Sequence, residues 1–93
     1  MPDIRLIRTH RLTLAMARAA AQGVIDQLGA EYDVVSEWSG NALHFERGGV
    51  HGHLLVQDRQ ATLEITLEGL FKAFAPLIEE KAAARMDQVF REA

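Results

Sequence analysis

Cysteine is absent from the 93-residue sequence, and proline, aromatic residues and excess positive charge are all scarce. The absence of cysteine excludes disulfides, thiolate metal sites and cysteine nucleophiles, and it suits a reducing cytoplasm. A formal net charge of −3 and a pI near 5.7 argue against binding to nucleic-acid phosphates. One tryptophan and one tyrosine provide no aromatic ladder for single-stranded nucleic acid. We therefore expect a cytoplasmic protein that does not bind nucleic acid.

Long hydrophobic runs are also missing. The longest apolar stretch, 12–21, is interrupted by Arg18 and falls short of the roughly 20 residues that a membrane-spanning helix needs. The first residues include Asp3 and Arg5 and contain no apolar core of a signal peptide. No repeat, low-complexity segment or linker divides the chain. We expect a single domain over residues 1–93, without a transmembrane segment or a secretory signal.

Two segments have helical periodicity. Thr13 is a suitable N-cap for a helix that ends near Leu28, with Gly29 closing it. A second helix follows Gly69, with Pro76 in its first turn. The apolar stripe of the first helix comprises Leu14, Ala17, Ala21, Val24, Ile25 and Leu28, and that of the second comprises Phe74, Ile78, Ala82, Met86, Val89 and Phe90.

Between these helices the apolar period changes to two, which indicates strands. Turns at 40–41, 48–49 and 58–59 separate four alternating runs, and tight turns there place Phe45 opposite Gly52 and Gly52 opposite Ile65. Every register puts the large apolar residues on one face. With a short strand at 4–8, the order is β-α-β-β-β-β-α. The sequence predicts an α+β fold, an antiparallel sheet with two helices packed on one face, which resembles a shortened helix-grip arrangement.

The same registers gather histidines and carboxylates on the uncovered face of the sheet. His44 lies opposite His53 and His53 opposite Glu64, while Glu46 lies opposite His51. Such side chains can bind zinc or transfer protons. A flat exposed sheet rarely supplies the outer hydrogen bonds that fix metal ligands, so a solvated polar face is favoured. We predict no cofactor and no metal; the candidate ligands to be tested are His44, His51, His53 and Glu64.

Two further surfaces could meet a partner. Ala15, Ala19 and Gly23 recur every four residues away from the core stripe and would permit close approach of another helix, including one from a homodimer, although alanine's helix propensity explains two of the three. Leu70 and Leu77 lie in the most apolar-aromatic segment, 67–77, and off the central stripe of the last helix. They could form an exposed patch. The favoured expectation is that they seal the corner between sheet and helix.

No catalytic motif is present. The chain lacks a phosphate-binding loop, a dinucleotide-binding glycine pattern, a zinc-protease helix and a nucleophile elbow. We predict no catalytic residues and no enzymatic activity.

One stretch resembles a known family. The residues are Trp38-Ser39-Gly40-Asn41-Ala42-Leu43-His44-Phe45-Glu46-Arg47, followed by Gly49-Val50-His51-Gly52. They resemble the small polyhydroxyalkanoic acid system proteins, bacterial proteins of about this length encoded near the genes of polyhydroxyalkanoate granules. The opening 4–10, the alanine-rich first helix and the ending 78–87 are similar as well.

The resemblance implies a cellular setting rather than a reaction. It suggests a non-enzymatic accessory protein of polyhydroxyalkanoate metabolism, associated with the granule or with a granule protein, and it carries over no catalytic or ligand-binding residues. Two alternatives stay open: a small-ligand-binding helix-grip-like domain, and metal binding through the histidine-rich face. The first alternative requires an internal cavity of roughly 300 Å³. A homodimer is compatible with each of the three.

Overall fold

The computed structural model describes residues 2–90, except for the side chains of residues 31 and 32. The α+β fold and its element order agree with the prediction. A 3₁₀ helix that the sequence did not indicate precedes the last helix. The elements are β1 (Ile4–Thr9), α1 (Leu14–Tyr32), β2 (Val35–Ser39), β3 (Ala42–Arg47), β4 (Val50–Val56), β5 (Gln60–Leu67), η1 (Gly69–Phe74) and α2 (Ala75–Val89).

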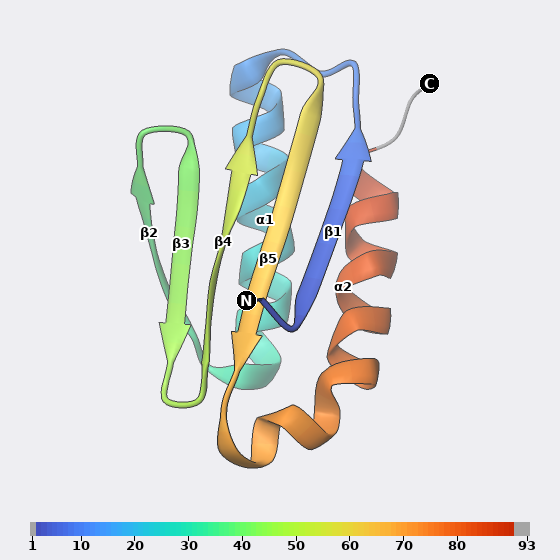
Figure 1. Cartoon of the computed structure of the whole chain (residues 1–93). Helices are drawn as coiled ribbons and strands as arrows, with labels where there is room; N and C mark the ends of the chain where they lie inside the picture. The colour runs from blue at the N-terminus through green and yellow to red at the C-terminus, as the bar shows by residue number, and fades with distance from the viewer. Residues whose placement is uncertain (1, 91–93) are drawn as a thin grey trace.

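The strands form one antiparallel sheet in the order β1-β5-β4-β3-β2 (Figure 1). The three predicted hairpin registers are all confirmed, including Trp38 opposite Leu43 and Leu54 opposite Leu63. β1 joins the free edge of β5, with Ile4 opposite Ile65. Both helices lie on the same face of the sheet, and its other face is uncovered (Figure 1).

Gly52 shows why the register is strict. It lies between Phe45 and Ile65 on the covered face, as predicted. A Cβ at this position would be 2.9 Å from Cζ of Phe45 and would collide with the main-chain carbonyl of Glu64. Phe45 and Ile65 are almost fully buried. The glycine therefore makes room for the aromatic ring of the neighbouring strand.

α1 begins as predicted and ends later. The hydroxyl of Thr13 accepts the Met16 N–H at 3.2 Å, which confirms the N-cap. The predicted end near Leu28 is wrong because the left-handed residue that closes the helix is Asp33, with φ 56°, and not Gly29. Gly29 lies inside the helix, where a Cβ would be 3.0 Å from Val34. It allows the returning chain to pass close to the helix.

Trp38 connects β2 to α1. Its indole N–H donates to the side-chain oxygen of Gln22 at 2.8 Å, and the Arg18 guanidinium lies 4.1 Å above its ring centroid. Arg18 also donates to the Gly40 carbonyl at 2.6 Å. The tryptophan and glycine of the family-like stretch thus fix the edge hairpin against the first helix.

The core between the sheet and the helices is filled. A void between the sheet and the helices measures about 20 Å³ and is lined by apolar side chains that include Phe45 and Ile78. A small-molecule site needs more than ten times that volume, roughly 300 Å³. The interior therefore provides no room for the ligand of a helix-grip-like binding domain.

Two residues of the predicted core stripes are exposed. Leu14, in the first turn of α1, is 37% exposed, and Phe74 is 51% exposed. The α-helical phase does not extend back to Phe74, because this residue ends a 3₁₀ helix and α2 begins only at Ala75. Ile78, in the first turns of α2, is buried near this end of the helix, and Phe71 packs against the core.

Candidate functional site

The segment from the end of β5 to the first turns of α2 forms a sharp corner at one end of the molecule (Figure 1). Leu67 is buried as the last residue of β5. Gly69 then adopts a φ of +61°, a conformation that other residues rarely adopt, and starts η1. Pro76 occupies the first turn of α2, where its missing N–H costs no helical hydrogen bond.

The β3–β4 turn holds this corner from one side. The N–H of Glu68 donates to the Gly49 carbonyl at 2.9 Å. The ring of Phe71 packs on Gly49 so closely that a Cβ there would lie 2.7 Å from its Cδ2. Gly49 has a φ of +91°, so the position favours glycine both for its backbone and for the ring above it.

The chain's first residues hold the corner from the other side. The Asp3 carboxylate accepts the Leu67 N–H at 2.8 Å through Oδ2 and pairs with Nζ of Lys72 at 3.0 Å through Oδ1. The Leu67 hydrogen bond, followed by that from Lys72, lowers the pKa of Asp3 below its ordinary value of 3.8. Residues more than 60 positions apart in the sequence thus fix η1 together.

Three apolar side chains of this corner point to solvent. Leu70 is 85% exposed, Phe74 51% and Leu77 46%. We name Leu70, Phe74 and Leu77 the corner patch. The expectation that Leu70 and Leu77 seal the sheet–helix corner is wrong because Phe71 and Ile78 occupy the inward positions instead. The sequence argument missed Phe74, since it assumed an uninterrupted α-helical phase.

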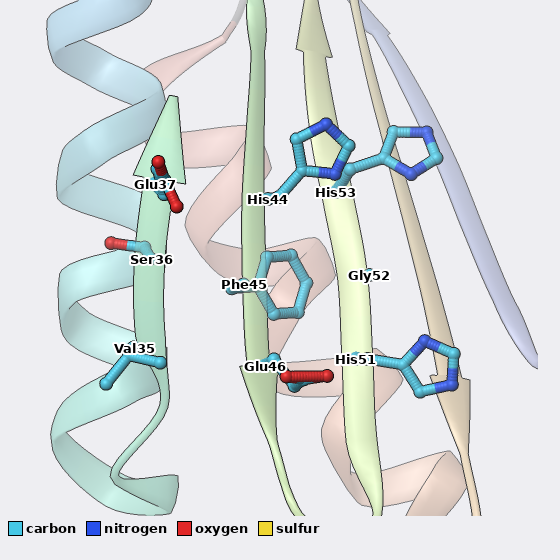
Figure 2. A pocket seen from close by; sticks show the side chains of 9 residues that line it. All are labelled: Val35, Ser36, Glu37, His44, Phe45, Glu46, His51, Gly52 and His53. Atoms are coloured by element: carbon cyan, nitrogen blue, oxygen red, sulfur yellow. The ribbon is translucent and has the colours of Figure 1, made fainter. Parts of the chain in front are cut away.

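The uncovered sheet face carries the predicted histidines. The rings of His44 and His53 lie side by side, 5.7 Å between centroids (Figure 2). Nε2 of His53 is 3.3 Å from Oε1 of Glu64, whose other oxygen is 3.0 Å from Nε of Arg5. Arg5 extends the row by one strand, and sequence reasoning missed it because the position of β1 in the sheet was not predicted.

His51 does not join the other histidines. It lies opposite Glu46, as the register predicted (Figure 2). Its Nε2 is 3.7 Å from the carboxylate of Glu68. Among residues 2–90, no three or more histidine or acidic side chains are grouped closely enough to hold a metal ion. A shallow hollow of about 510 Å³ lies between the His44–His53 pair and the Glu46–His51 pair. Val35 and Glu37 also line it.

The small-residue stripe of α1 is accessible. Ala15 and Ala19 are exposed, and nothing lies within 4 Å of the position that a Cβ of Gly23 would take. The structure shows no group that covers this stripe within the described residues. The structure thus confirms that the stripe lies away from the core. Its role as a contact surface stays a prediction.

Comparisons with known proteins agree with the resemblance seen in the sequence. A family model described as "Putative polyhydroxyalkanoic acid system protein" matches residues 4–90. No curated protein and no solved structure is significantly similar. No helix within the described part of the chain has the length and hydropathy required to cross a membrane. Because the match runs from β1 to the end of the core, the chain belongs to the family of polyhydroxyalkanoic acid system proteins.

Proposed function

We propose that this protein is a non-enzymatic, cytoplasmic accessory protein of polyhydroxyalkanoate metabolism that attaches to the surface of the storage granule through the corner patch. Membership of the polyhydroxyalkanoic acid system family supports the setting. The exposed corner patch carries the proposal, because a chain with a net charge of −3 is best served by an apolar surface for such attachment.

The rigidity of the corner supports attachment. Phe71 on Gly49 and Asp3 on Lys72 order η1 before any contact, so docking costs little further chain entropy. Complete burial of a leucine or phenylalanine contributes about 1.5–3 kcal/mol, and these three side chains start partly exposed, so the gross gain is about 3–5 kcal/mol. Part of this gain is offset by the loss of translational and rotational freedom, so a single copy binds weakly and reversibly.

The shape of the surface favours a polymer over a peptide. The side chains project from the outside of a turn, and Leu70 is 85% exposed, which is typical of a protrusion rather than a groove. Peptides are usually bound in grooves or along sheet edges. An aliphatic polyester surface can deform around a protruding apolar knob and offers no specific hydrogen-bonding pattern.

The buried polar groups support a structural rather than a catalytic role. His10 accepts the Leu12 N–H on Nδ1 at 3.1 Å, so its Nε2–H donates to the Gln57 carbonyl at 2.9 Å. Thr62 accepts from the side chain of Gln60 at 3.3 Å. The two His10 hydrogen bonds join the segment before α1 to the β4–β5 hairpin and occupy both ring nitrogens of the imidazole.

Granule fractionation tests the proposal. The wild type and the Leu70→Ser, Leu77→Ser variant are expressed in a polymer-accumulating bacterium, and the granule pellet is quantified. We expect the variant to be depleted at least about fivefold from the pellet, since it loses most of the apolar contact. Leu14→Ser, Met16→Ser is the matched control, because it removes two exposed apolar side chains, 37% and 57% exposed, at the start of α1, which lies at the other end of the molecule from the corner (Figure 1).

The outcomes separate the two parts of the proposal. A folded variant that sediments with granules as the wild type does excludes the corner patch as the attachment site. A wild type that stays entirely in the soluble fraction overturns granule association. Binding of the wild type to protein-free polymer particles distinguishes a direct contact with the polymer from one through a granule protein. If the wild type does not bind these particles, the corner patch does not contact the polymer itself.

A further inference from the structure

The uncovered sheet face is arranged in cross-strand rows. One row runs across all five strands and is charged; we name it the charged row. A neighbouring row is uncharged; we name it the neutral row. The charged row is Arg5, Glu64, His53, His44 and Glu37, and the neutral row is Ile7, Thr62, Leu55, Ala42 and Ser39, in the strand order β1-β5-β4-β3-β2.

β4 is the central strand of the sheet, which gives the face an approximate centre. A two-fold axis parallel to β4, above this face, reverses the strand order and keeps the level along the strands. Under that axis each row meets its own reversed copy. His53 and Leu55, both on β4, then face their own equivalents in the second copy.

The reversed charged row brings opposite charges together at both of its ends, where Arg5 meets Glu37 of the second copy. Further in, the carboxylate of Glu64 meets the imidazole of His44, which can donate a hydrogen bond. Within the described part of the chain Glu37 takes part in no ion pair, although it stands exposed at the edge of the sheet. Arg5 is 57% exposed beside Glu64, so its guanidinium can reach a second carboxylate.

The neutral row provides the apolar part of the same contact. Leu55 is half-buried at the centre and meets its own equivalent, and Thr62 meets Ala42. Ile7 is 39% exposed on this face. The contact thus combines an uncharged row with charged pairs at the two edge strands, and polar groups at the rim are usual in protein interfaces.

We propose that a second copy of this chain docks face to face on the open sheet, with the two-fold axis along β4 and Arg5 paired with Glu37 of the other copy at both ends of the charged row. The sheets of such sandwiches align within about 30°, which keeps each row close to its reversed copy. This interface is separate from the corner patch and does not depend on granule attachment.

The size of the face sets the strength of the dimer. Five strands spaced about 4.8 Å apart give a width near 24 Å, and a typical strand of about six residues gives a length near 20 Å, so two copies bury roughly 1,000 Å² in total. That lies near the lower limit of specific interfaces. We expect a dimer that forms at micromolar concentration and dissociates on dilution, measured by sedimentation velocity.

The outer edge of β1 is a poorer contact for a second copy. The carbonyl of Ile7 accepts from the side chain of Arg8 at 2.9 Å, and Arg8 is itself held by Asp87 at 2.5 Å. This side chain occupies the edge that an added strand would need. The small-residue stripe of α1 permits close approach of a second copy but offers no complementary charge. Dimerisation through this stripe is the alternative that the cross-linking experiment below can detect.

Cross-linking tests the axis directly, because the natural chain has no cysteine. His53→Cys places one thiol near the axis in each copy, and mild oxidation should convert most of the protein to a covalent dimer. Ala19→Cys, on the exposed side of α1, is the matched control and should remain largely monomeric. Preferred cross-linking of Ala19→Cys would assign the dimer to the helical face and overturn the proposal.

Charge exchange tests the pairing. Glu37→Arg places arginine opposite Arg5 at both ends, and Arg5→Glu places glutamate opposite Glu37. Each variant alone should dimerise about tenfold or more weakly, because like charges face each other. A mixture of the two should regain the wild-type affinity, since both ends of the heterodimer again join opposite charges.

The control for charge alone is Glu80→Arg on α2, which makes the same charge change on the helical side and should leave dimerisation unchanged. Melting temperatures of all variants establish that they are folded. Monomeric wild type at several hundred micromolar, or a mixture that associates no better than the separate variants, would refute the face-to-face dimer.

Discussion

The two faces of the sheet are built from alternate residues of the same five strands, yet different physics governs them. The covered face is determined by volume, since Phe45 occupies the space that a side chain at Gly52 would fill. The open face is determined by charge, with Arg5 and His53 on either side of Glu64. We therefore expect small changes of shape to matter on one face, and changes of charge to matter on the other mainly for association.

The largest effect is expected from Gly52→Val on the covered face. The new side chain would collide with the Glu64 carbonyl and with Phe45, and overpacking of this kind costs about 3 kcal/mol or more of unfolding free energy. Urea denaturation measures it. Gly48→Ala is the matched control, because no atom lies within 4 Å of its Cβ position. Similar stability of the two variants would contradict the assigned register.

Gly49→Ala should lower the free energy of unfolding by about 1–3 kcal/mol, which is less than the effect of Gly52→Val. Gly49 lies in the β3–β4 turn, which packs against the corner. The substitution strains a backbone with φ +91° and pushes on the ring of Phe71. Because Phe71 anchors η1, hydrogen exchange at residues 69–74 should accelerate more than in the sheet. Uniform acceleration throughout the chain would show that Phe71 does not hold the corner specifically.

A pH-dependent effect is expected at Asp3. Its carboxylate is stabilised in the folded state, so its folded pKa lies below the ordinary value of 3.8. The contribution to stability is therefore complete above about pH 3.8 and is lost as the pH falls through the lower folded value. Asp3→Asn removes the contribution of the ionised carboxylate to stability at every pH. The difference in melting temperature between wild type and variant should be present at pH 6 and shrink below pH 3.8, whereas a constant difference would exclude this ion pair as its source.

The smallest effect is expected on the open face. His44→Ala with His53→Ala should change the unfolding free energy by less than about 0.5 kcal/mol, because both side chains are substantially accessible and gain little from burial. The same result is expected with zinc added. Thermal melts with and without zinc measure it, and a zinc-dependent stabilisation that disappears in the double variant would reverse this prediction.

Local patterns were sufficient to predict the fold. The glycine and aspartate turns fixed three hairpin registers, and the Thr13 cap and Pro76 fixed two helix starts, because these features act over a few residues. The end of α1 was predicted wrongly, since Asp33 and Gly29 are both compatible with a helix end and only the return path past Val34 decides between them.

The candidate sites were predicted less completely. The register alone placed His44, His53 and Glu64 in one row, and the structure agrees. It could not place Arg5 there, because nothing local indicates that β1 pairs with β5. It also could not decide whether Leu70 points inward, since that depends on which neighbour fills the corner.

The sequence by itself determined the order of the elements, the alternation of the two sheet faces and the family to which the chain belongs, because each depends on spacing along the chain. The tertiary structure alone decided which apolar residues remain exposed. Phe71 takes the inward place because Gly49 leaves room for it, and Asp3 holds η1 from the far end of the chain. These contacts join distant residues, so no local pattern contains them, and they are the reason that Leu70, Phe74 and Leu77 face the solvent.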